Sequence, residues 1–266
     1  MKPLRVGVVS YLNAMPLWFS LRHDPGVEVV PDTPARLADK MQSGALDIGL
    51  LPVVEALRQP GLELIPGLGI GADGIVESVG LFTRKDLPEI ESVAVTSASR
   101  TSVALCKIIL HEAGAKPALL EASLQAQDLA DRSEDAVLMI GDACLAARRT
   151  ATDRVWVDLA AEWKLLTDLP FVFAMWAGKP GVASPAMIER LHETLRSGRN
   201  ETFELVRMAA MDTGWTEQEL AVYLTQIIQH ELTPAHHKGL LEFTRRAIEL
   251  DLLPPGSMDA ALDALR

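Results

Sequence analysis

Positive charge, aromatic side chains and long apolar runs are all scarce in this chain of 266 residues. The net charge of −11 leaves no basic face for phosphates, which argues against nucleic acid as a partner. No stretch approaches the roughly 20 apolar residues of a membrane span, so no membrane partner is expected. The first apolar run covers only four residues, whereas a signal peptide needs about 7–15. We therefore expect a cytoplasmic protein.

Cysteine is nearly absent as well. Cys106 and Cys144 each lie alone in an apolar helical pattern, which predicts buried small side chains and offers neither a disulfide nor a metal site. Aromatic residues make up 5% of the chain, a share that suits α/β layers built from Ala, Val, Leu and Ile.

Short apolar runs alternate with helical patterns along the first two thirds of the chain. This alternation predicts parallel βαβ units with right-handed crossovers. The expected strands are residues 4–10, 27–31, 46–51, 93–96, 118–121, 136–140 and 154–158. The expected helices between and after them are residues 14–22, 35–42, 101–113, 124–132, 142–149 and 159–166. From Pro185 onward the pattern is helical, over 185–196, 200–211, 217–229 and 235–252.

Two β-like segments, residues 75–84 and 170–177, separate these α/β cycles. We therefore predict a two-lobed fold of the periplasmic-binding-protein type (type II), with a mostly parallel sheet flanked by helices in each lobe. The first lobe would comprise residues 1–88 and the helical tail 177–266, and the second lobe residues 89–176. The ligand of such a fold lies in the cleft between the lobes. A single doubly wound domain with a helical appendage stays open as an alternative, since strand count alone does not separate the two.

Two apparent sequence motifs are rejected because the residues around them do not fit. Residues 69–74 match G-x-G-x-x-G, but a dinucleotide fingerprint must open a helix and this one runs into a strand-like pattern. His230-Glu231 resembles the start of a zinc-protease helix, yet Pro234 occupies the place of the second histidine. His236 and His237 are neighbours that point to different sides of a helix. We predict no metal and no cofactor.

Polar side chains follow the first strand where a cleft would lie. Ser10, Tyr11 and Asn13 cluster hydrogen-bonding groups there, although the residues alone favour a helix cap followed by a turn. Asp142 follows the strand at 136–140 and either caps the next helix or contacts a ligand, with capping favoured. Asp47 is expected to be structural.

The loop at residues 96–102 is the best anion site in the sequence. It precedes a helix, whose first N–H groups and positive dipole end attract a carboxylate. Hydroxyl groups and one guanidinium are added at Ser97, Ser99, Arg100, Thr101 and Ser102. Helix capping alone needs only one of those hydroxyls. A ligand carboxylate and a simple cap therefore both remain possible explanations.

These segments together resemble the chorismate dehydratase family of the futalosine route to menaquinone. The matching stretches are 9–17 (VSYLNAMPL), 44–53 (GALDIGLLPV), 78–82 (SVGLF), 99–102 (SRTS), 138–143 (LMIGDA) and 158–174 (DLA…W…T…LPFVFA). The resemblance implies a two-lobed fold without a cofactor and a lyase that removes water from chorismate to give 3-[(1-carboxyvinyl)oxy]benzoate. It spans roughly residues 4–178, and the tail adds little to it.

Chorismate is a dianion, so binding it without a metal requires hydroxyl, amide and N–H donors. The expected substrate-binding residues are Ser10, Ser78, Ser97, Ser99, Arg100, Thr101, Ser102 and Asp142. Tyr11 or Asn13 would act in catalysis by hydrogen-bonding the departing hydroxyl. No motif places a basic side chain convincingly, which leads to the hypothesis that the substrate's own enolpyruvyl carboxylate takes the proton.

Three other functions stay open. The sister enzyme, 1,4-dihydroxy-6-naphthoate synthase, has the same fold but a first loop like Ser-Pro-Cys-Pro-Asn-Asp, from which Ser10-Tyr-Leu-Asn13 departs. A non-catalytic carboxylate-binding protein would share the fold too. The effector domain of a transcription regulator would need a DNA-binding helix-turn-helix, whereas this sequence begins directly with a strand. The sequence indicates no oligomeric state.

Overall fold

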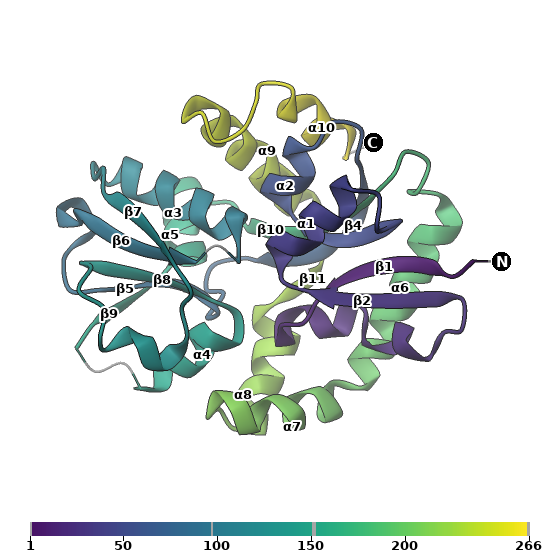
Figure 1. Cartoon of the computed structure of the whole chain (residues 1–266), viewed down its shortest axis with the longest axis horizontal. Coiled ribbons are helices and arrows are strands. Elements are labelled where there is room, and N and C mark those ends of the chain that lie inside the picture. Colours follow the sequence, from purple (N-terminus) through teal and green to yellow (C-terminus); the bar gives the residue numbers. More distant parts are fainter. Residues whose placement is uncertain (1, 97, 151–152, 265–266) are drawn as a thin grey trace.

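The computed structural model describes residues 2–96, 98–150 and 153–264, and it folds into two α/β lobes (Figure 1). The sheet of the first lobe has the order β11-β4-β10-β3-β1-β2. Its strands are β1 (Leu4–Val9), β2 (Val27–Asp32), β3 (Ile48–Pro52), β4 (Glu63–Ala72), β10 (Phe171–Gly178) and β11 (Gln229–Glu231). The sheet of the second lobe has the order β7-β6-β8-β5-β9. Its strands are β5 (Val79–Thr83), β6 (Ser92–Thr96), β7 (Ala118–Ala122), β8 (Ala136–Ile140) and β9 (Val155–Asp158).

Helices cover the sheets and form the C-terminal tail. The α-helices are α1 (Pro34–Gln42), α2 (Val53–Arg58), α3 (Arg100–Glu112), α4 (Gly141–Thr150), α5 (Leu159–Thr167), α6 (Pro185–Asn200), α7 (Thr202–Thr213), α8 (Glu217–Val222), α9 (Pro234–Glu249) and α10 (Ser257–Asp263). Short 3₁₀ helices are η1 (Leu12–Leu17), η2 (Phe19–His23), η3 (Leu87–Glu89) and η4 (Ala126–Leu129), and a π-helical turn, η5 (Tyr223–Ile227), extends α8. Within the described chain, no helix is both long and apolar enough to cross a membrane.

Both sheets are mixed, which corrects the expectation of mostly parallel sheets. In the first lobe β1 pairs parallel with β2 and β3, whereas β10 runs antiparallel to β3 and β4. In the second lobe β6 pairs parallel with β7 and β8, whereas β5 runs antiparallel to β8 and β9. The antiparallel pairs involve the four strands that flank the connections between the lobes. A chain that leaves for the other lobe does not return through a right-handed helical crossover, so the parallel rule does not apply to it.

The predicted lobe boundaries differ from the observed sheets. The prediction assigned β5 to the first lobe and β10 to the second, but β5 lies in the second sheet and β10 in the first. The actual connections are residues 73–78 and 159–170. Every residue of β5 and of β10 is buried, so neither strand shows the polar alternation that would reveal which sheet it joins.

Strand β4 was not anticipated because glycines interrupt its apolar pattern. Gly69 and Gly71 lie within this strand rather than at a helix start, which confirms the rejection of the dinucleotide fingerprint. A Cβ atom on Gly69 would collide with the carbonyl oxygen of Ala174 in β10. Glycine in a strand often marks such a close approach between two backbones.

The helix expected at residues 14–22 is instead the pair of 3₁₀ helices η1 and η2. Pro16 lies inside η1, and its missing N–H prevents one continuous α-helix from running from Leu12 to His23. The segment expected as a helix at 124–132 likewise forms only the short 3₁₀ helix η4. The region after β1 is therefore a tight, irregular loop, which suits a segment that lies in the cleft.

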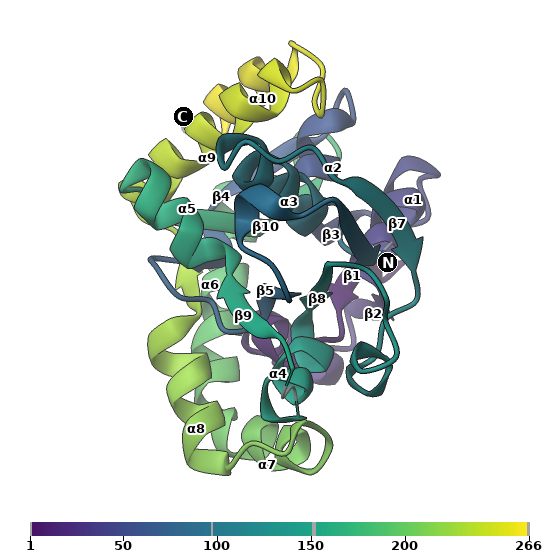
Figure 2. The same cartoon turned by 90° about the vertical axis from the view of Figure 1, so that its left-hand side faces the viewer.

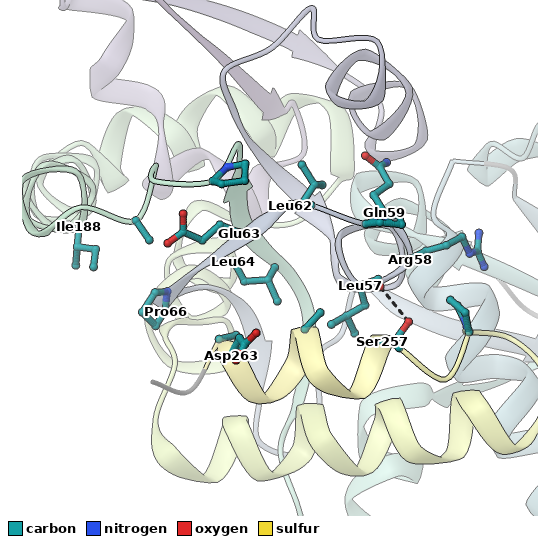
Figure 3. A pocket seen from close by; sticks show the side chains of 18 residues that line it. Leu57, Arg58, Gln59, Leu62, Glu63, Leu64, Pro66, Ile188, Ser257 and Asp263 are labelled. Atoms are coloured by element: carbon teal, nitrogen blue, oxygen red, sulfur yellow. Dashed lines mark hydrogen bonds between the residues drawn. The ribbon is translucent and has the colours of Figure 1, made fainter.

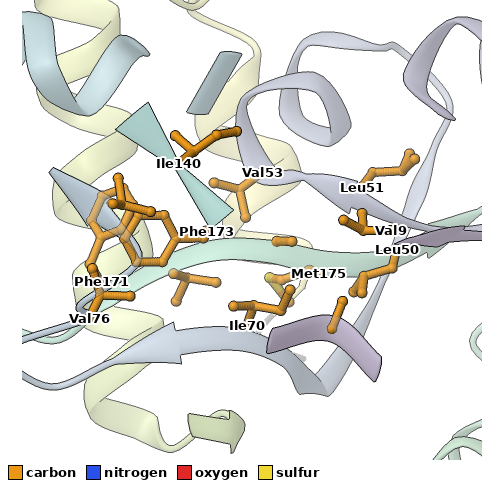
Figure 4. Close-up of a cluster of buried hydrophobic side chains, with 14 of the residues drawn as sticks. Val9, Leu50, Leu51, Val53, Ile70, Val76, Ile140, Phe171, Phe173 and Met175 are labelled. Carbon is orange, nitrogen blue, oxygen red and sulfur yellow. The ribbon is translucent and has the colours of Figure 1, made fainter. Parts of the chain in front are cut away.

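The core of the first lobe is built around β10. Figure 4 shows Phe171, Phe173 and Met175 of this strand among apolar side chains from β1, β3 and β4. The rings of Phe171 and Phe243 meet edge to face with centroids 5.1 Å apart, which anchors α9 onto the strand. The tail also contacts the second lobe, because α7 packs on α4 and α9 on α3 (Figure 2). The tail helices thus span both lobes.

Candidate functional site in the interlobe cleft

A cavity of about 50 Å³ lies between the two lobes. It is lined by Val9, Tyr11, Asn13, Pro34, Pro52, Ile70, Val79, Ser99, Ser102, Ile140, Gly141, Phe173 and Ala174. Figure 4 shows part of its apolar wall, with Ile140 from the second lobe and Val9, Ile70 and Phe173 from the first. Ligand pockets typically measure about 300–1,000 Å³. Binding a metabolite here therefore requires the lobes to separate.

A larger cavity of about 820 Å³ lies in the first lobe, between the α2–β4 loop and α10 (Figure 3). Its polar groups are largely engaged with one another or with the backbone. The Ser257 hydroxyl donates to the carbonyl of Leu57 at 2.9 Å, and the Gln59 amide donates to the carbonyl of Ala38 at 3.1 Å. The smaller interlobe cavity instead gathers polar side chains from both lobes, so we place the functional site there.

Asn13 brings an unpaired polar atom to this cavity. The residue is 8% exposed, and its Oδ1 atom is buried without a hydrogen-bond partner. Its backbone carbonyl contacts His230 Nε2 at 2.7 Å, and since a carbonyl only accepts, this nitrogen carries the proton. Burial lowers the pKa of His230 to about 4, so the imidazole is neutral. A buried acceptor left unpaired costs about 1–3 kcal/mol, so a donor group brought to Oδ1 would remove this cost.

Tyr11 and the start of α4 meet across the cleft. Gly141 has a φ of +59°, and a Cβ atom there would lie 2.9 Å from the Tyr11 ring, so only glycine fits this contact. The backbone N–H of Leu12 donates to the carboxylate of Asp142 at 3.1 Å. Asp142 therefore binds the first residue of η1 in the opposite lobe and lies inside α4 rather than at its cap, which corrects the role favoured from the sequence. It does not line the cavity.

Burial controls the charges of Asp142 and Tyr11. It raises the pKa of Asp142 to about 6, with a further contribution from the nearby charge of Asp212. Burial and the carboxylate of Asp142 also raise the pKa of Tyr11. The phenol of Tyr11 is consequently protonated at neutral pH and is available as a hydrogen-bond donor.

The loop before α3 divides its polar groups between two surfaces. Ser99 caps α3 by accepting the N–H of Ser102 at 3.3 Å, and the two hydroxyls are 2.9 Å apart at the cavity wall. Thr101 instead accepts the backbone N–H of Val54 from the first lobe at 3.2 Å. Residues three apart share a helix face, whereas the residue between them points elsewhere. Of the described residues of the predicted anion clamp, Ser99 and Ser102 line the cavity.

Arg100 faces away from the cavity, contrary to its predicted contact with substrate. Its guanidinium pairs with Glu55 of α2 at 2.8 Å, and Glu55 also pairs with Arg58 at 2.8 Å. Glu55 is 4% exposed, and a buried carboxylate requires such partners. Arg100 therefore links the lobes at the rim of the cleft.

Ser78 lies behind the cavity wall and is completely buried. Its hydroxyl accepts a hydrogen bond from Tyr223 at 2.7 Å, and its carbonyl accepts the N–H of Gly141 at 2.7 Å. Burial is the main reason why the pKa of Tyr223 lies well above its usual range, although the hydrogen bond with Ser78 opposes this shift. The phenol of Tyr223 thus joins the C-terminal tail to the start of the second lobe.

The chain matches the model of a protein family described as menaquinone biosynthesis over residues 4–249. The chain belongs to this family. It is 32% identical over 271 residues to the chorismate dehydratase of Thermus thermophilus, and the alignment covers 96% of this chain and 98% of that protein.

Solved structures establish the fold to which this family member belongs. The alkanesulfonate-binding protein of Xanthomonas axonopodis pv. citri superposes with a TM-score of 0.70 at 15% identity, covering 98% of each chain. A Candida albicans protein described as having the generic periplasmic-binding-protein fold superposes with a TM-score of 0.65 at 12% identity, covering all of this chain and 95% of that one. These similarities confirm the predicted two-lobed fold of the periplasmic-binding-protein type.

The site residues predicted for this menaquinone-biosynthesis family member fall into distinct groups. Those that line the cavity are Tyr11, Asn13, Ser99 and Ser102. Those whose side chains bind other parts of the protein are Ser78, Arg100, Thr101 and Asp142. Ser10 is exposed and does not line the cavity. Ser97 lies outside the described residues.

Sequence reasoning missed the contacts that Tyr223 and His230 make around the site. Tyr223 and His230 come from the tail, which the sequence pattern indicated only as helices. The π-helical turn that contains Tyr223 and the short strand that contains His230 carry no sequence signal of their own. Among the described residues, no group of three or more His, Cys, Asp or Glu side chains could hold a metal ion.

Proposed function

We propose that the protein dehydrates chorismate to 3-[(1-carboxyvinyl)oxy]benzoate in menaquinone biosynthesis, without a cofactor. Membership of the menaquinone-biosynthesis family and 32% identity to the Thermus thermophilus chorismate dehydratase support this activity. The observation that carries the proposal is the interlobe cavity, where the unpaired Oδ1 of Asn13 lies with the hydroxyls of Ser99 and Ser102.

The reaction removes two neighbouring groups from the ring. A proton leaves the ring carbon that bears the ether oxygen, hydroxide leaves the adjacent carbon, and together they form water as the ring becomes aromatic. The driving force is large, so the protein has to lower a barrier rather than supply energy. Holding the substrate in a reactive geometry is sufficient for much of that effect, because effective molarities of about 10⁵–10⁸ M are reached in well-oriented intramolecular reactions.

In this proposal the substrate's enolpyruvyl carboxylate accepts the proton. The side chains that line the cavity comprise an amide, a phenol and hydroxyls, together with apolar groups. A protein general base typically contributes about 10²–10⁴-fold, which an intramolecular carboxylate can replace. The amide of Asn13 and the protonated phenol of Tyr11 would hydrogen-bond the departing hydroxyl.

Ser99 and Ser102 would bind a carboxylate of the substrate. Both hydroxyls lie at the first turn of α3, whose unpaired N–H groups and positive dipole end favour an anion. The chain carries a net charge of −11, so long-range attraction does not favour a dianion and local donors have to bind it. Closure of the lobes would exclude water from this set of hydrogen bonds.

The first experiment incubates the purified protein with chorismate and follows the aromatic product by chromatography and ultraviolet absorbance. We expect product without added metal or nucleotide, and none from heat-denatured protein. Binding without turnover would indicate a non-catalytic carboxylate-binding protein instead. Activity that a chelator abolishes and zinc restores would contradict a cofactor-free reaction.

The second experiment tests the substrate as its own base. A chorismate analogue with an uncharged amide in place of the enolpyruvyl carboxylate should bind, though more weakly, and turn over extremely slowly at saturation. A matched analogue with its ring carboxylate replaced by an amide should lose affinity but retain turnover when bound. Near-normal turnover of the first analogue would indicate a base supplied by the protein.

A further inference from the structure

Two connections join the lobes within the first 178 residues. The first comprises residues 73–78 between β4 and β5, and the second comprises residues 159–170 between β9 and β10, including α5. Asp158 is the last residue of β9 and therefore lies where the second connection begins. Its side chain is buried, with the residue 6% exposed.

The Asp158 carboxylate accepts four backbone hydrogen bonds. Its Oδ1 atom accepts the N–H groups of Ala160 and Ala161, at 2.9 and 3.1 Å, and so caps α5. Its Oδ2 atom accepts the N–H groups of Val76 and Glu77 in the other connection, at 3.0 and 2.8 Å. One side chain thus binds both connections between the lobes, with one oxygen for each.

The first connection contains a strained turn beside this carboxylate. The N–H of Ser78 donates to the carbonyl of Val76 at 2.7 Å, and Glu77 between them has a φ of +63°. This is a γ-turn with a positive φ, a conformation that is rare and strained for a residue other than glycine. Such a conformation persists only where surrounding contacts hold it. The two hydrogen bonds to Asp158 are among these contacts, together with the ion pair between Glu77 and Arg148 at 3.5 Å.

This turn leads directly into the proposed site. Ser78 follows Glu77 and binds Tyr223 and Gly141, and Val79 lines the interlobe cavity. We propose that Asp158 is a positioning residue that locks the two connections together and so sets Ser78 and Val79 at the cleft each time the lobes close. This inference rests on the proposed function for its effect on turnover, but the lock itself can be measured without substrate.

The test compares Asp158→Asn with the wild-type protein. The asparagine Oδ1 can still cap α5, but its NH₂ group would face the N–H groups of Val76 and Glu77, donor against donor. Asp158→Ser is a second variant that keeps a capping oxygen and is too short to bridge the connections. Ser184→Ala is the matched control, because it removes only the cap of α6, where the Ser184 hydroxyl accepts the N–H of Met187.

Two measurements decide the outcome. Hydrogen exchange of the Val76 and Glu77 amides should accelerate at least about tenfold in the Asn and Ser variants, the minimum expected for loss of a charge-assisted hydrogen bond. With chorismate, kcat should fall at least about tenfold while KM changes less than about threefold, the pattern of a lost transition-state interaction. Ser184→Ala should change neither quantity.

Each contrary result has a distinct meaning. Unchanged hydrogen exchange at Val76 and Glu77 would overturn the proposal that Asp158 holds the two connections together. Faster exchange with unchanged kcat would overturn the positioning role, because loss of the Asp158 hydrogen bonds would then not affect turnover. A wild-type protein that is inactive on chorismate would overturn the proposed function alone, because the exchange experiment would still test the lock.

Discussion

Asp142→Asn should stabilise the protein at alkaline pH and leave it unchanged at acidic pH. Asparagine has nearly the same shape as aspartate, and its Oδ1 can keep accepting the N–H of Leu12. What the substitution removes is the charge, which burial disfavours. Burial raises the pKa of Asp142 from its usual 3.8 to about 6.

The magnitude follows from that difference in pKa. At about 1.4 kcal/mol per pH unit, ionising Asp142 in the folded protein costs up to about 3 kcal/mol more than ionising it in the unfolded chain. Because the folded-state pKa is raised, this group's favourable contribution is complete below about pH 4 and is lost as pH rises through about 6. The variant cannot ionise at this position, so its stability does not fall for this reason in this pH range. It should therefore exceed the wild type by up to about 3 kcal/mol at pH 8, or roughly 6–12 °C in Tm at about 2–4 °C per kcal/mol.

The assay is thermal unfolding of both proteins in matched buffers between pH 4 and pH 8. Asp212→Asn serves as the control, because Asp212 is exposed and only adds to the repulsion at Asp142. Its Tm should shift far less than that of Asp142→Asn. A variant no more stable than wild type at pH 8, or one with the same advantage at every pH, would refute the reasoning.

Three further substitutions test individual contacts of the cleft. Thr101→Val leaves the Val54 N–H without an acceptor, so the free energy of unfolding in urea should drop by about 1–3 kcal/mol; an unchanged midpoint would show that the bond is replaced. Asn13→Ala should lower turnover of chorismate far more than it lowers Tm, because Oδ1 has no partner to lose, and equal turnover would remove Asn13 from the site. Tyr223→Phe deletes only the bond to Ser78, so kcat should fall with little change in Tm; unchanged kcat would make Tyr223 purely structural.

Local patterns allowed most elements of the fold to be predicted. The strand at 136–140 was located residue for residue, and the helices at α1 and α3 within one residue at their starts. Two errors are local, since 3₁₀ helices replace the helices expected at 14–22 and 124–132; the others concern long-range choices. β5 and β10 are buried along their whole length, so nothing in their composition distinguishes one sheet from the other. β4 was missed because its glycines meet a neighbouring backbone that only the tertiary structure reveals.

The candidate site shows the same division. The first-loop residues Tyr11 and Asn13 could be predicted from their position after a strand, and Ser99 and Ser102 from their position at the start of a helix. The directions in which the side chains of Arg100 and Thr101 point could not be predicted, because they depend on Glu55 and Val54 in the other lobe. The contribution of Tyr223 depends on a π-helical turn more than 140 residues from Ser78 in sequence.

The two sheets differ in how much of the chain each one needs. The second sheet uses a single continuous stretch, β5 to β9, whereas the first needs strands that extend from β1 to β11. On the ribosome, where chains emerge from the N-terminus and domains fold as units, the second lobe has all its strands once Asp158 has been made. The first lobe has to wait for the three residues of β11. We therefore expect the second lobe, which is inserted in the sequence of the first, to fold before the first lobe. The carboxylate of Asp158 can then accept its backbone hydrogen bonds as soon as α5 begins to form.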